Sequence, residues 1–314
     1  MTKKEKVVVT GGAGFIGSHL VLKLLENGYI VSVVDDLSSG RQENVDLFKK
    51  DVEFFEMDIN DTETLTKACE NARYVFHLAA IPAVPKSIED PITTNRANID
   101  GTVSVLIAAR DAGVQKVIFS SSASIYGNSL ALPKMEDINP EPLSPYAIQK
   151  LTGEHYMAAF SRFFNLQTVS LRYFNVFGSR QDSRSSYATV IPLFIEAIQK
   201  NESPTIHGDG QMTRDFIYVE DVVRANLLAA QSAAGNGEVF NIASGRPISV
   251  SELFNTISRV LEASLQPRHG PARVGDINDS YADVTKAKSS FGFQAQVTLE
   301  EGIRKTATSL SLAS

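Results

Sequence analysis

The stretch TGGAGFIG, Thr10–Gly17, lies between the apolar run Val7–Thr10 and a helical pattern over Ile16–Asn27. Glycines at positions 11, 14 and 17 give it a G-x-x-G-x-x-G spacing. Glycine permits a tight turn and a close approach of the backbone to a ligand. The unpaired amides and the dipole at the start of the following helix attract an anion. This stretch therefore predicts a turn that binds a pyrophosphate.

Apolar strand patterns alternate with helical patterns through the first half of the chain. We expect strands at Val7–Thr10, Val31–Asp35, Val52–Met57, Arg73–Leu78, Lys116–Ser121 and Thr168–Tyr173, and helices at Ile16–Asn27, Thr62–Asn71, Thr94–Ala112 and Tyr146–Phe163. Continuous apolar strands between helices are typical of a parallel sheet covered on both faces. The predicted fold class is α/β, a Rossmann doubly wound parallel sheet with a smaller C-terminal substrate-binding lobe.

Composition excludes several other classes. The chain has 314 residues, of which 43% are hydrophobic and 21% charged, as in an ordinary globular protein. A net charge of -6 argues against a nucleic-acid partner. One cysteine, Cys69, excludes an internal disulfide, and the five histidines show no metal spacing, so we expect no metal site. Without a run of 18 apolar residues, we expect no membrane span and a cytoplasmic location.

A carboxylate follows the second expected strand. Asp35 at this place can bind the ribose hydroxyls of an adenosine and would repel a 2′-phosphate, which favours NAD over NADP. Asp58 and Ile59 follow the third strand, where we expect them to meet the adenine edge. A glycine-rich turn with a strand before it, a helix after it and Asp35 at the next strand end predicts a dinucleotide site.

Three polar residues suggest the chemistry. Ser122 follows the fifth strand, at the edge where ligands bind in open α/β sheets. Tyr146 and Lys150 are spaced i, i+4 and share one helix face. The ammonium and the positive nicotinamide favour the Tyr146 phenolate, which can remove a hydroxyl proton as hydride leaves the same carbon. Ser122 can hold that oxygen by a hydrogen bond.

Together, these motifs resemble the extended short-chain dehydrogenases/reductases, and specifically the NAD-dependent nucleotide-sugar 4-epimerases. Within these, the chain is most similar to the UDP-N-acetylglucosamine 4-epimerases. The matching stretches cover almost the whole chain and are Thr10–Gly17, Asp35–Gly40, His77–Ala80, Ser120–Gly127, Tyr146–Lys150, Leu171–Gly178, Gly208–Asp215 and Arg273–Asp276. The resemblance implies reversible oxidation at C4 of a UDP-hexose by tightly held NAD, through a 4-keto sugar.

The resemblance also implies roles for individual residues. The implied catalytic residues are Ser122, Tyr146 and Lys150. The implied NAD-binding residues are Gly11, Gly14, Phe15, Ile16, Gly17, Asp35, Asp36, Leu37, Ser38, Ser39, Gly40, Asp58, Ile59, Leu78, Ala79, Ala80, Asn98, Ser120, Tyr146, Lys150 and Tyr173. The implied substrate-binding residues are Val84, Ser87, Ser122, Tyr146, Asn175, Ala188, Val190, Arg214, Arg273, Asp276 and Ser280.

Two positions bear on the reaction and the sugar. Ala123 and Ser124 stand where the family's 4,6-dehydratases carry an acid pair, which argues against dehydration. Ser280 matches the position where galactose-restricted epimerases carry a bulky tyrosine, so there is room for a 2-acetamido group. The expected reaction interconverts UDP-GlcNAc and UDP-GalNAc, and also UDP-glucose and UDP-galactose.

Other interpretations stay open. UDP-glucuronate is a competing 4-epimerase substrate, whose carboxylate Arg180 or Arg184 can meet, and other reactions of extended short-chain dehydrogenases on nucleotide sugars are further alternatives. A non-catalytic NAD-binding redox sensor is an alternative of another class, although such proteins usually lack the Tyr146–Lys150 pair.

The organisation of the lobes and of the assembly also follows from the resemblance. We expect residues 1–175 and about 215–242 to form the NAD-binding lobe, and 176–214 and about 243–314 the nucleotide-sugar lobe. The helices Thr94–Ala112 and Tyr146–Phe163 resemble those that pair into a four-helix bundle, so we expect a homodimer. A role in polysaccharide biosynthesis would fit such an enzyme.

Overall fold

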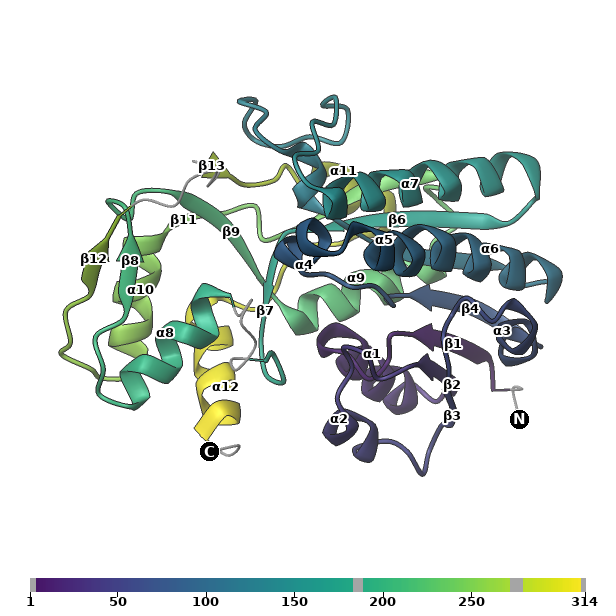
Figure 1. Cartoon of the computed structure of the whole chain (residues 1–314), viewed down its shortest axis with the longest axis horizontal. Coiled ribbons are helices and arrows are strands. Elements are labelled where there is room, and N and C mark those ends of the chain that lie inside the picture. The colour runs from purple at the N-terminus through teal and green to yellow at the C-terminus, as the bar shows by residue number, and fades with distance from the viewer. Residues whose placement is uncertain (1–3, 183–188, 272–278, 312–314) are drawn as a thin grey trace.

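The computed structural model describes residues 4–182, 189–271 and 279–311. Within them, a parallel seven-stranded sheet forms the larger lobe, with a smaller lobe beside it (Figure 1). The strands run in the order β10-β6-β5-β4-β1-β2-β3 and have the bounds β1 Lys6–Thr10, β2 Ile30–Asp35, β3 Glu53–Glu56, β4 Ala72–His77, β5 Lys116–Ser122, β6 Gln167–Tyr173 and β10 Glu238–Ile242. The order winds outward from β1 in both directions, which confirms the doubly wound Rossmann prediction.

Helices cover both faces of this sheet because its strands are apolar on both sides. Val7 and Val9 of β1 pack in the core on one face, and Val8 packs in the core on the other. The first face is covered by α1 (Phe15–Glu26), α9 (Val219–Gln231) and α11 (Thr285–Phe291), and the second by α3 (Thr62–Cys69), α6 (Gly101–Asp111) and α7 (Pro145–Phe163). The short helices are α2 (Gln42–Asp46), α4 (Val84–Glu89) and α5 (Pro91–Asn95).

The helix expected at Thr94–Ala112 differs from the structure. It begins as α5, continues through a π-helical turn over Arg96–Asp100, and only then becomes α6. In this turn Asn98 accepts the Ile81 N–H at 2.8 Å and donates to the Ile81 carbonyl at 3.1 Å. A π turn changes the direction of side chains within a helix. The apolar pattern on either side gives no sign of it, because the partner lies in another segment.

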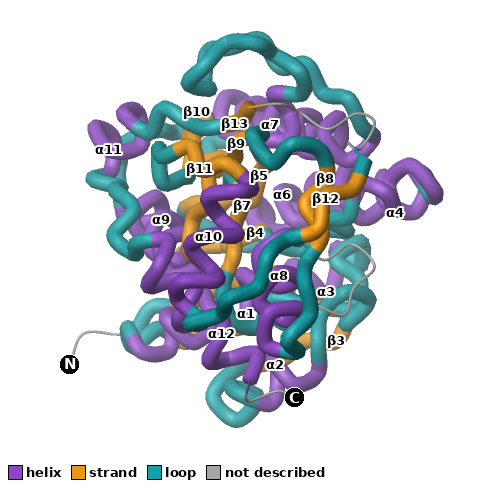
Figure 2. Tube along the Cα trace, turned by 90° about the vertical axis from the view of Figure 1, so that its left-hand side faces the viewer, coloured by secondary structure: helices purple, strands orange, loops and turns teal. Residues whose placement is uncertain are grey.

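The smaller lobe is built from segments that follow β6. Its mixed sheet joins β7 (Asn175–Phe177), β9 (Thr213–Tyr218), β11 (Pro247–Ser249) and β13 (Asp279–Ser280), and β8 (Thr205–His207) pairs with β12 (Arg268–Gly270). In Figure 2 this lobe faces the viewer, with its helices α8 (Val190–Gln199), α10 (Val250–Val260) and α12 (Leu299–Ser311). Phe194, Phe254 and Ile303 bring these helices into one core.

The proline-rich segment before α7 is a loop, as predicted, and it contacts the smaller lobe. Its Lys134 N–H donates to the Tyr281 carbonyl at 2.8 Å, and the Asp283 N–H donates to the Lys134 carbonyl at 2.9 Å. Ser144 ends the loop and caps α7, accepting the Ala147 N–H at 3.2 Å. Across the described ranges, no helix is both long and apolar enough to cross a membrane.

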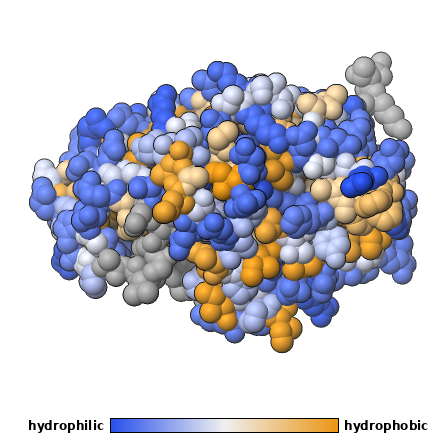
Figure 3. All heavy atoms as spheres, turned by 90° about the horizontal axis from the view of Figure 1, so that it is seen from above, coloured by the Kyte–Doolittle hydropathy of each residue, from blue (hydrophilic) through white to orange (hydrophobic). Residues whose placement is uncertain are grey.

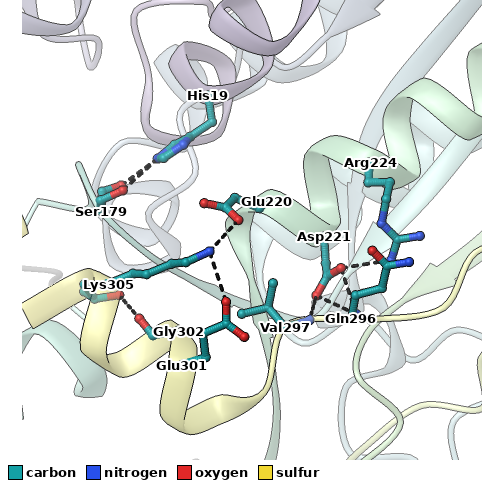
Figure 4. Close-up of polar contacts among 11 residues, drawn as sticks. His19, Ser179, Glu220, Asp221, Arg224, Gln296, Val297, Glu301, Gly302 and Lys305 are labelled. Carbon is teal, nitrogen blue, oxygen red and sulfur yellow. Dashed lines mark hydrogen bonds and ion pairs between the residues drawn. The ribbon is translucent and has the colours of Figure 1, made fainter.

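Polar contacts fasten the C-terminal segment to α9 (Figure 4). The buried carboxylate of Asp221 accepts the backbone N–H groups of Gln296 and Val297 at 2.9 and 3.0 Å, and pairs with Arg224. Beside it, Lys305 of α12 pairs with Glu220 at 2.9 Å on the surface. A buried carboxylate that satisfies backbone donors is expected to matter far more than the exposed pair.

We expect Asp221→Ala to lower the free energy of unfolding by about 3 kcal/mol, because buried amides lose a charged acceptor. Urea denaturation at constant m-value measures the change. The neighbouring variant Glu220→Ala removes only the exposed pair and should cost less than about 1 kcal/mol. Equal losses in the two variants would contradict this account.

Candidate active site

The glycine-rich turn leaves no room for a side chain at Gly11 or Gly17. Gly11 has a φ of +73°, and a Cβ there would lie 2.6 Å from the backbone nitrogen of Ala79. A Cβ on Gly17 would lie 2.0 Å from the Gly11 carbonyl oxygen. No side chain caps the start of α1 at Gly14. This bare helix start, at the carboxyl end of β1, is a cradle that fits a pyrophosphate.

Asp35 lies buried beside this cradle. Its carboxylate accepts the Ala13 N–H at 2.9 Å and the Leu37 N–H at 3.0 Å. Burial raises the pKa of this carboxyl, and the two backbone hydrogen bonds lower it. A Cβ on Gly40 would lie 2.7 Å from Asp35 Oδ1, so Gly40 lets the loop fold over the carboxylate. A carboxylate has about four acceptor positions, so Asp35 can also accept ribose hydroxyls.

Other predicted cofactor residues have structural partners. The Ile59 side chain packs in the core against Gly101, where a Cβ would lie 2.5 Å from Ile59 Cδ1. Tyr173 is buried and hydrogen-bonds Asn226 at 3.0 Å and the Ser120 side chain. His77, expected at the end of a buried strand, is buried there between Thr10 and Thr102.

The structure brings the three predicted catalytic residues together. α7 lies close to β5 because Gly153 has no side chain: a Cβ there would lie 2.5 Å from Phe119 Cζ. Tyr146 lies in the first turn of α7, where the Ser122 side chain is close enough to affect the pKa of its hydroxyl. Lys150 Nζ donates to the Ser120 carbonyl at 2.7 Å and lies 5.9 Å from the centre of the Tyr146 ring.

Burial dominates the electrostatics of this pair. It raises the pKa of Tyr146 to about 12, although the Ser122 side chain opposes the change. It lowers the pKa of Lys150 to about 7, against the attraction of Glu154. A positive group bound nearby would favour the phenolate of Tyr146. The site therefore holds an acid–base group whose ionisation depends on what binds beside it.

Two charged residues that the sequence analysis missed lie beneath the site. Glu154, one turn beyond Lys150, pairs with Arg172 of β6 at 2.8 Å, and both side chains are 4% exposed. An arginine inside an apolar strand pattern was an available signal, because a buried charge needs a partner. The sequence alone does not reveal which residue that partner is.

On the substrate side, the strand register pairs two of the predicted residues. Parallel pairing of β13 with β9 sets Ser280 opposite Arg214. Asn175 begins β7, which pairs with β9 at Phe216. Next to Arg214, the buried Asp215 accepts N–H groups from Ser244 at 2.8 Å and from Ala282 at 3.2 Å. These bonds fix the chain that carries Arg214 and the chain that follows Ser280.

The other residues predicted to bind the substrate lie in several parts of the chain. Ser87 is buried and accepts the Tyr146 N–H at 3.1 Å, so it holds the start of α7. Val84 begins α4 and Val190 begins α8. Ala188, Arg273 and Asp276 lie outside the described residues, as does Arg184. Among the described residues, no group of three His, Cys, Asp or Glu side chains is placed to hold a metal ion.

Comparison with known proteins identifies the family. A model of the NAD dependent epimerase/dehydratase family matches residues 7–243. The chain belongs to this family. The glycine cradle and Asp35 fit the NAD that the family uses, and the chain is an NAD-dependent isomerase of the epimerase type.

Several relatives of this epimerase match over nearly their full length. The UDP-glucose 4-epimerase of Mycolicibacterium smegmatis is 41% identical over 96% of this chain and 97% of its own. The structure of a UDP-N-acetylglucosamine 4-epimerase from Methanobrevibacter ruminantium, in complex with UDP-N-acetylmuramic acid, matches with a TM-score of 0.95, 42% identity and 100% of each chain. A Thermotoga maritima UDP-glucose 4-epimerase with UDP-glucose matches with a TM-score of 0.93 and 42% identity, over 98% of this chain and 99% of its own.

The depressed pKa of Lys150 makes stability depend on pH in the NAD-free epimerase. The folded chain loses this proton near pH 7, whereas the unfolded chain keeps it to about 10.5. Between these values the unfolded chain binds more protons, so rising pH stabilises the fold. Relative to Lys150→Met, which carries no such group, the wild-type free energy of unfolding should increase between pH 7 and 10, by up to about 1.4 kcal/mol per unit.

Urea denaturation of both proteins across this pH range measures the difference, and other titrating groups cancel between them. Parallel pH curves for the wild type and Lys150→Met would show that the Lys150 pKa is not depressed.

Proposed function

We propose that this epimerase catalyses the reversible C4 epimerisation of a UDP-hexose, interconverting UDP-GlcNAc and UDP-GalNAc and also UDP-glucose and UDP-galactose. One observation carries the proposal: Ser122, Tyr146 and Lys150 meet at the carboxyl edge of the sheet, with Lys150 Nζ bound to the Ser120 carbonyl and 5.9 Å from the centre of the Tyr146 ring. The same edge carries the glycine cradle at Gly11. The similarity to UDP-sugar 4-epimerases over almost the whole chain supports it.

The mechanism assigns each proton transfer to this chain's own residues. Bound NAD supplies a reversible hydride acceptor. Tyr146 takes the proton of the sugar 4-hydroxyl as the C4–H bond breaks, and Ser122 holds the oxygen in place. The 4-keto sugar turns over, so that hydride adds to the opposite face of C4, and Tyr146 returns the proton to the oxygen. The Lys150 ammonium stabilises the phenolate form of Tyr146.

The substrate assignment rests on the pair Ser280 and Arg214. Arg214 can bind a phosphate of the UDP group, since guanidinium groups bind phosphate by paired hydrogen bonds. Ser280, its neighbour across β13 and β9, is small and partly exposed. A small side chain at this position leaves room for a 2-acetamido group. We therefore favour N-acetylated sugars, and UDP-glucuronate is the comparison substrate.

We also propose that the enzyme acts as a homodimer through α5 to α7. Three large apolar side chains on these helices are exposed: Ile92 is 82% exposed, Ile148 51% and Phe163 70%. Figure 3 looks down on the side where α7 lies and shows apolar groups among hydrophilic ones. Pairing α5 to α7 of two copies would bury them. In this proposal, residues 1–175 and about 215–242 form the NAD-binding lobe, and 176–214 and about 243–314 form the nucleotide-sugar lobe, of which α11 packs on the large sheet.

Tyr146→Phe should reduce kcat by about 10²- to 10⁴-fold, because the ring remains while the proton-transferring hydroxyl is lost. Chromatographic separation of the two epimers measures the rate. Tyr156→Phe, on the exposed part of the same helix, serves as the matched control and should keep full activity. Turnover of Tyr146→Phe within a few-fold of the wild type would rule out the mechanism.

Ser280→Tyr should abolish activity on UDP-GlcNAc while largely preserving activity on UDP-glucose, because the bulky ring fills the space of the acetamido group. Product analysis with UDP-GlcNAc, UDP-glucose and UDP-glucuronate tests both proteins. An equal loss on all sugars would mean that Ser280 does not select for the acetamido group. If the wild type epimerises only UDP-glucuronate, the assignment of UDP-GlcNAc as the substrate is wrong and UDP-glucuronate takes its place.

A further inference from the structure

A buried ion pair lies directly beneath the three serines that end β5. Glu154 receives two hydrogen bonds from Arg172, at 2.9 Å from Nε and 2.8 Å from Nη2. The same carboxylate accepts the Ser121 hydroxyl at 2.5 Å. Ser121 stands between Ser120, which accepts Lys150, and Ser122, which lies next to Tyr146. The ion pair thus holds the chain immediately before Ser122.

A tyrosine hydroxyl ties the chain after Ser122 to the same ion pair. Tyr126 ends a short 3₁₀ helix, Ala123–Tyr126, which is capped at its start by Ser122. Its hydroxyl accepts from Arg172 Nη1 at 2.9 Å and donates to Asn241 Oδ1 at 2.7 Å. The residue is 1% exposed, so water does not compete for these bonds.

Asn241 extends this arrangement toward the smaller lobe. Its side-chain amide donates to the carbonyl of Lys134 at 3.0 Å and to that of Asp283 at 3.3 Å. Asp283 lies three residues after Ser280. The chain that follows the proposed sugar-selecting residue is therefore held by the same hydrogen-bonded frame as the chain around Ser122.

We propose that Tyr126 is a positioning residue for the epimerisation: with the Glu154–Arg172 pair, its hydroxyl holds Ser122 at the distance from Tyr146 that proton transfer requires. The inference rests on the proposed function, because it takes Ser122 and Tyr146 as the residues at the sugar oxygen. Ser122 is bound to the frame on both sides, through Ser121 and through the 3₁₀ helix. Loss of either tie lets Ser122 move, and a displacement of well under 1 Å weakens a hydrogen bond.

Tyr126→Phe removes the hydroxyl and keeps the ring. We expect kcat to fall about 3- to 10-fold, which corresponds to one weakened hydrogen bond in the transition state. The KM for the UDP-sugar and the NAD content of the purified holoenzyme should change less than about twofold, because neither ligand is expected to contact Tyr126. Ser121→Ala removes the hydrogen bond to Glu154 that holds the chain just before Ser122, and it should lower kcat to a similar extent. It also tests the proposal if Tyr126→Phe fails to fold.

The decisive comparison repeats Tyr126→Phe in a Ser122→Ala background. If Tyr126 acts through Ser122, its replacement should then change kcat by less than about twofold, because coupled residues are not additive. Tyr74→Phe removes a tyrosine hydroxyl from β4, away from the serine run, and is the control for the loss of a tyrosine hydroxyl as such.

The outcomes separate this inference from the proposed function. Unchanged kcat in both Tyr126→Phe and Ser121→Ala, in a wild type that epimerises UDP-sugars, would overturn the inference and leave the function standing. If Tyr126→Phe lowers kcat by the same factor in the wild-type and in the Ser122→Ala background, the inference is also overturned. The effect of Tyr126 would then not act through Ser122. A wild type inactive on every UDP-sugar would overturn the proposed function, and the inference with it.

Discussion

The start of α1 passes so close to the turn after β1 that no side chain fits between them, and the rest of the site depends on that close approach. Any side chain at Gly17 would collide with the Gly11 carbonyl, and any at Gly11 would collide with the chain after β4. Glycine at both places lets α1 begin directly at the sheet edge. Because parallel strands end at a common edge, Asp35 and Ser122 are brought to the same side of the molecule as the cradle.

Around that edge the protein accepts charges in its interior that a purely structural core would avoid. The Lys150 ammonium is costly to bury, which is why its pKa is depressed. The Glu154–Arg172 pair adds two more buried charges, and such pairs are weak contributors to stability. Their hydrogen bonds give them a geometric role: Glu154 accepts the Ser121 hydroxyl, and Arg172 donates to the Tyr126 hydroxyl, so the pair holds the segments on both sides of Ser122. These buried charges therefore add little to the stability of the fold, but they fix the positions of the segments around Ser122.

In the smaller lobe, the positions of the predicted substrate residues depend on the register between β13 and β9 and not on a local sequence motif. Ser280 and Arg214 are neighbours because β13 pairs with β9 in one particular alignment. Buried Asp215 supports this alignment by binding backbone groups at Ser244, Gly245 and Ala282. A slip of one residue would turn every side chain of a strand to the other face. In the proposed function, the choice of sugar is therefore linked to the packing of the buried Asp215 carboxylate.

The sequence by itself determined the features that local chemistry dictates. The glycine spacing, the carboxylate after the second strand, the i, i+4 pair Tyr146 and Lys150, and the alternation of strands and helices each lie within one short segment. Only the tertiary structure decided that Glu154 pairs with Arg172, that Asn98 lies in a π turn against Ile81, and that Ser280 faces Arg214. These features join segments far apart in the chain, and no local pattern of residues encodes which distant partner packing will bring into contact.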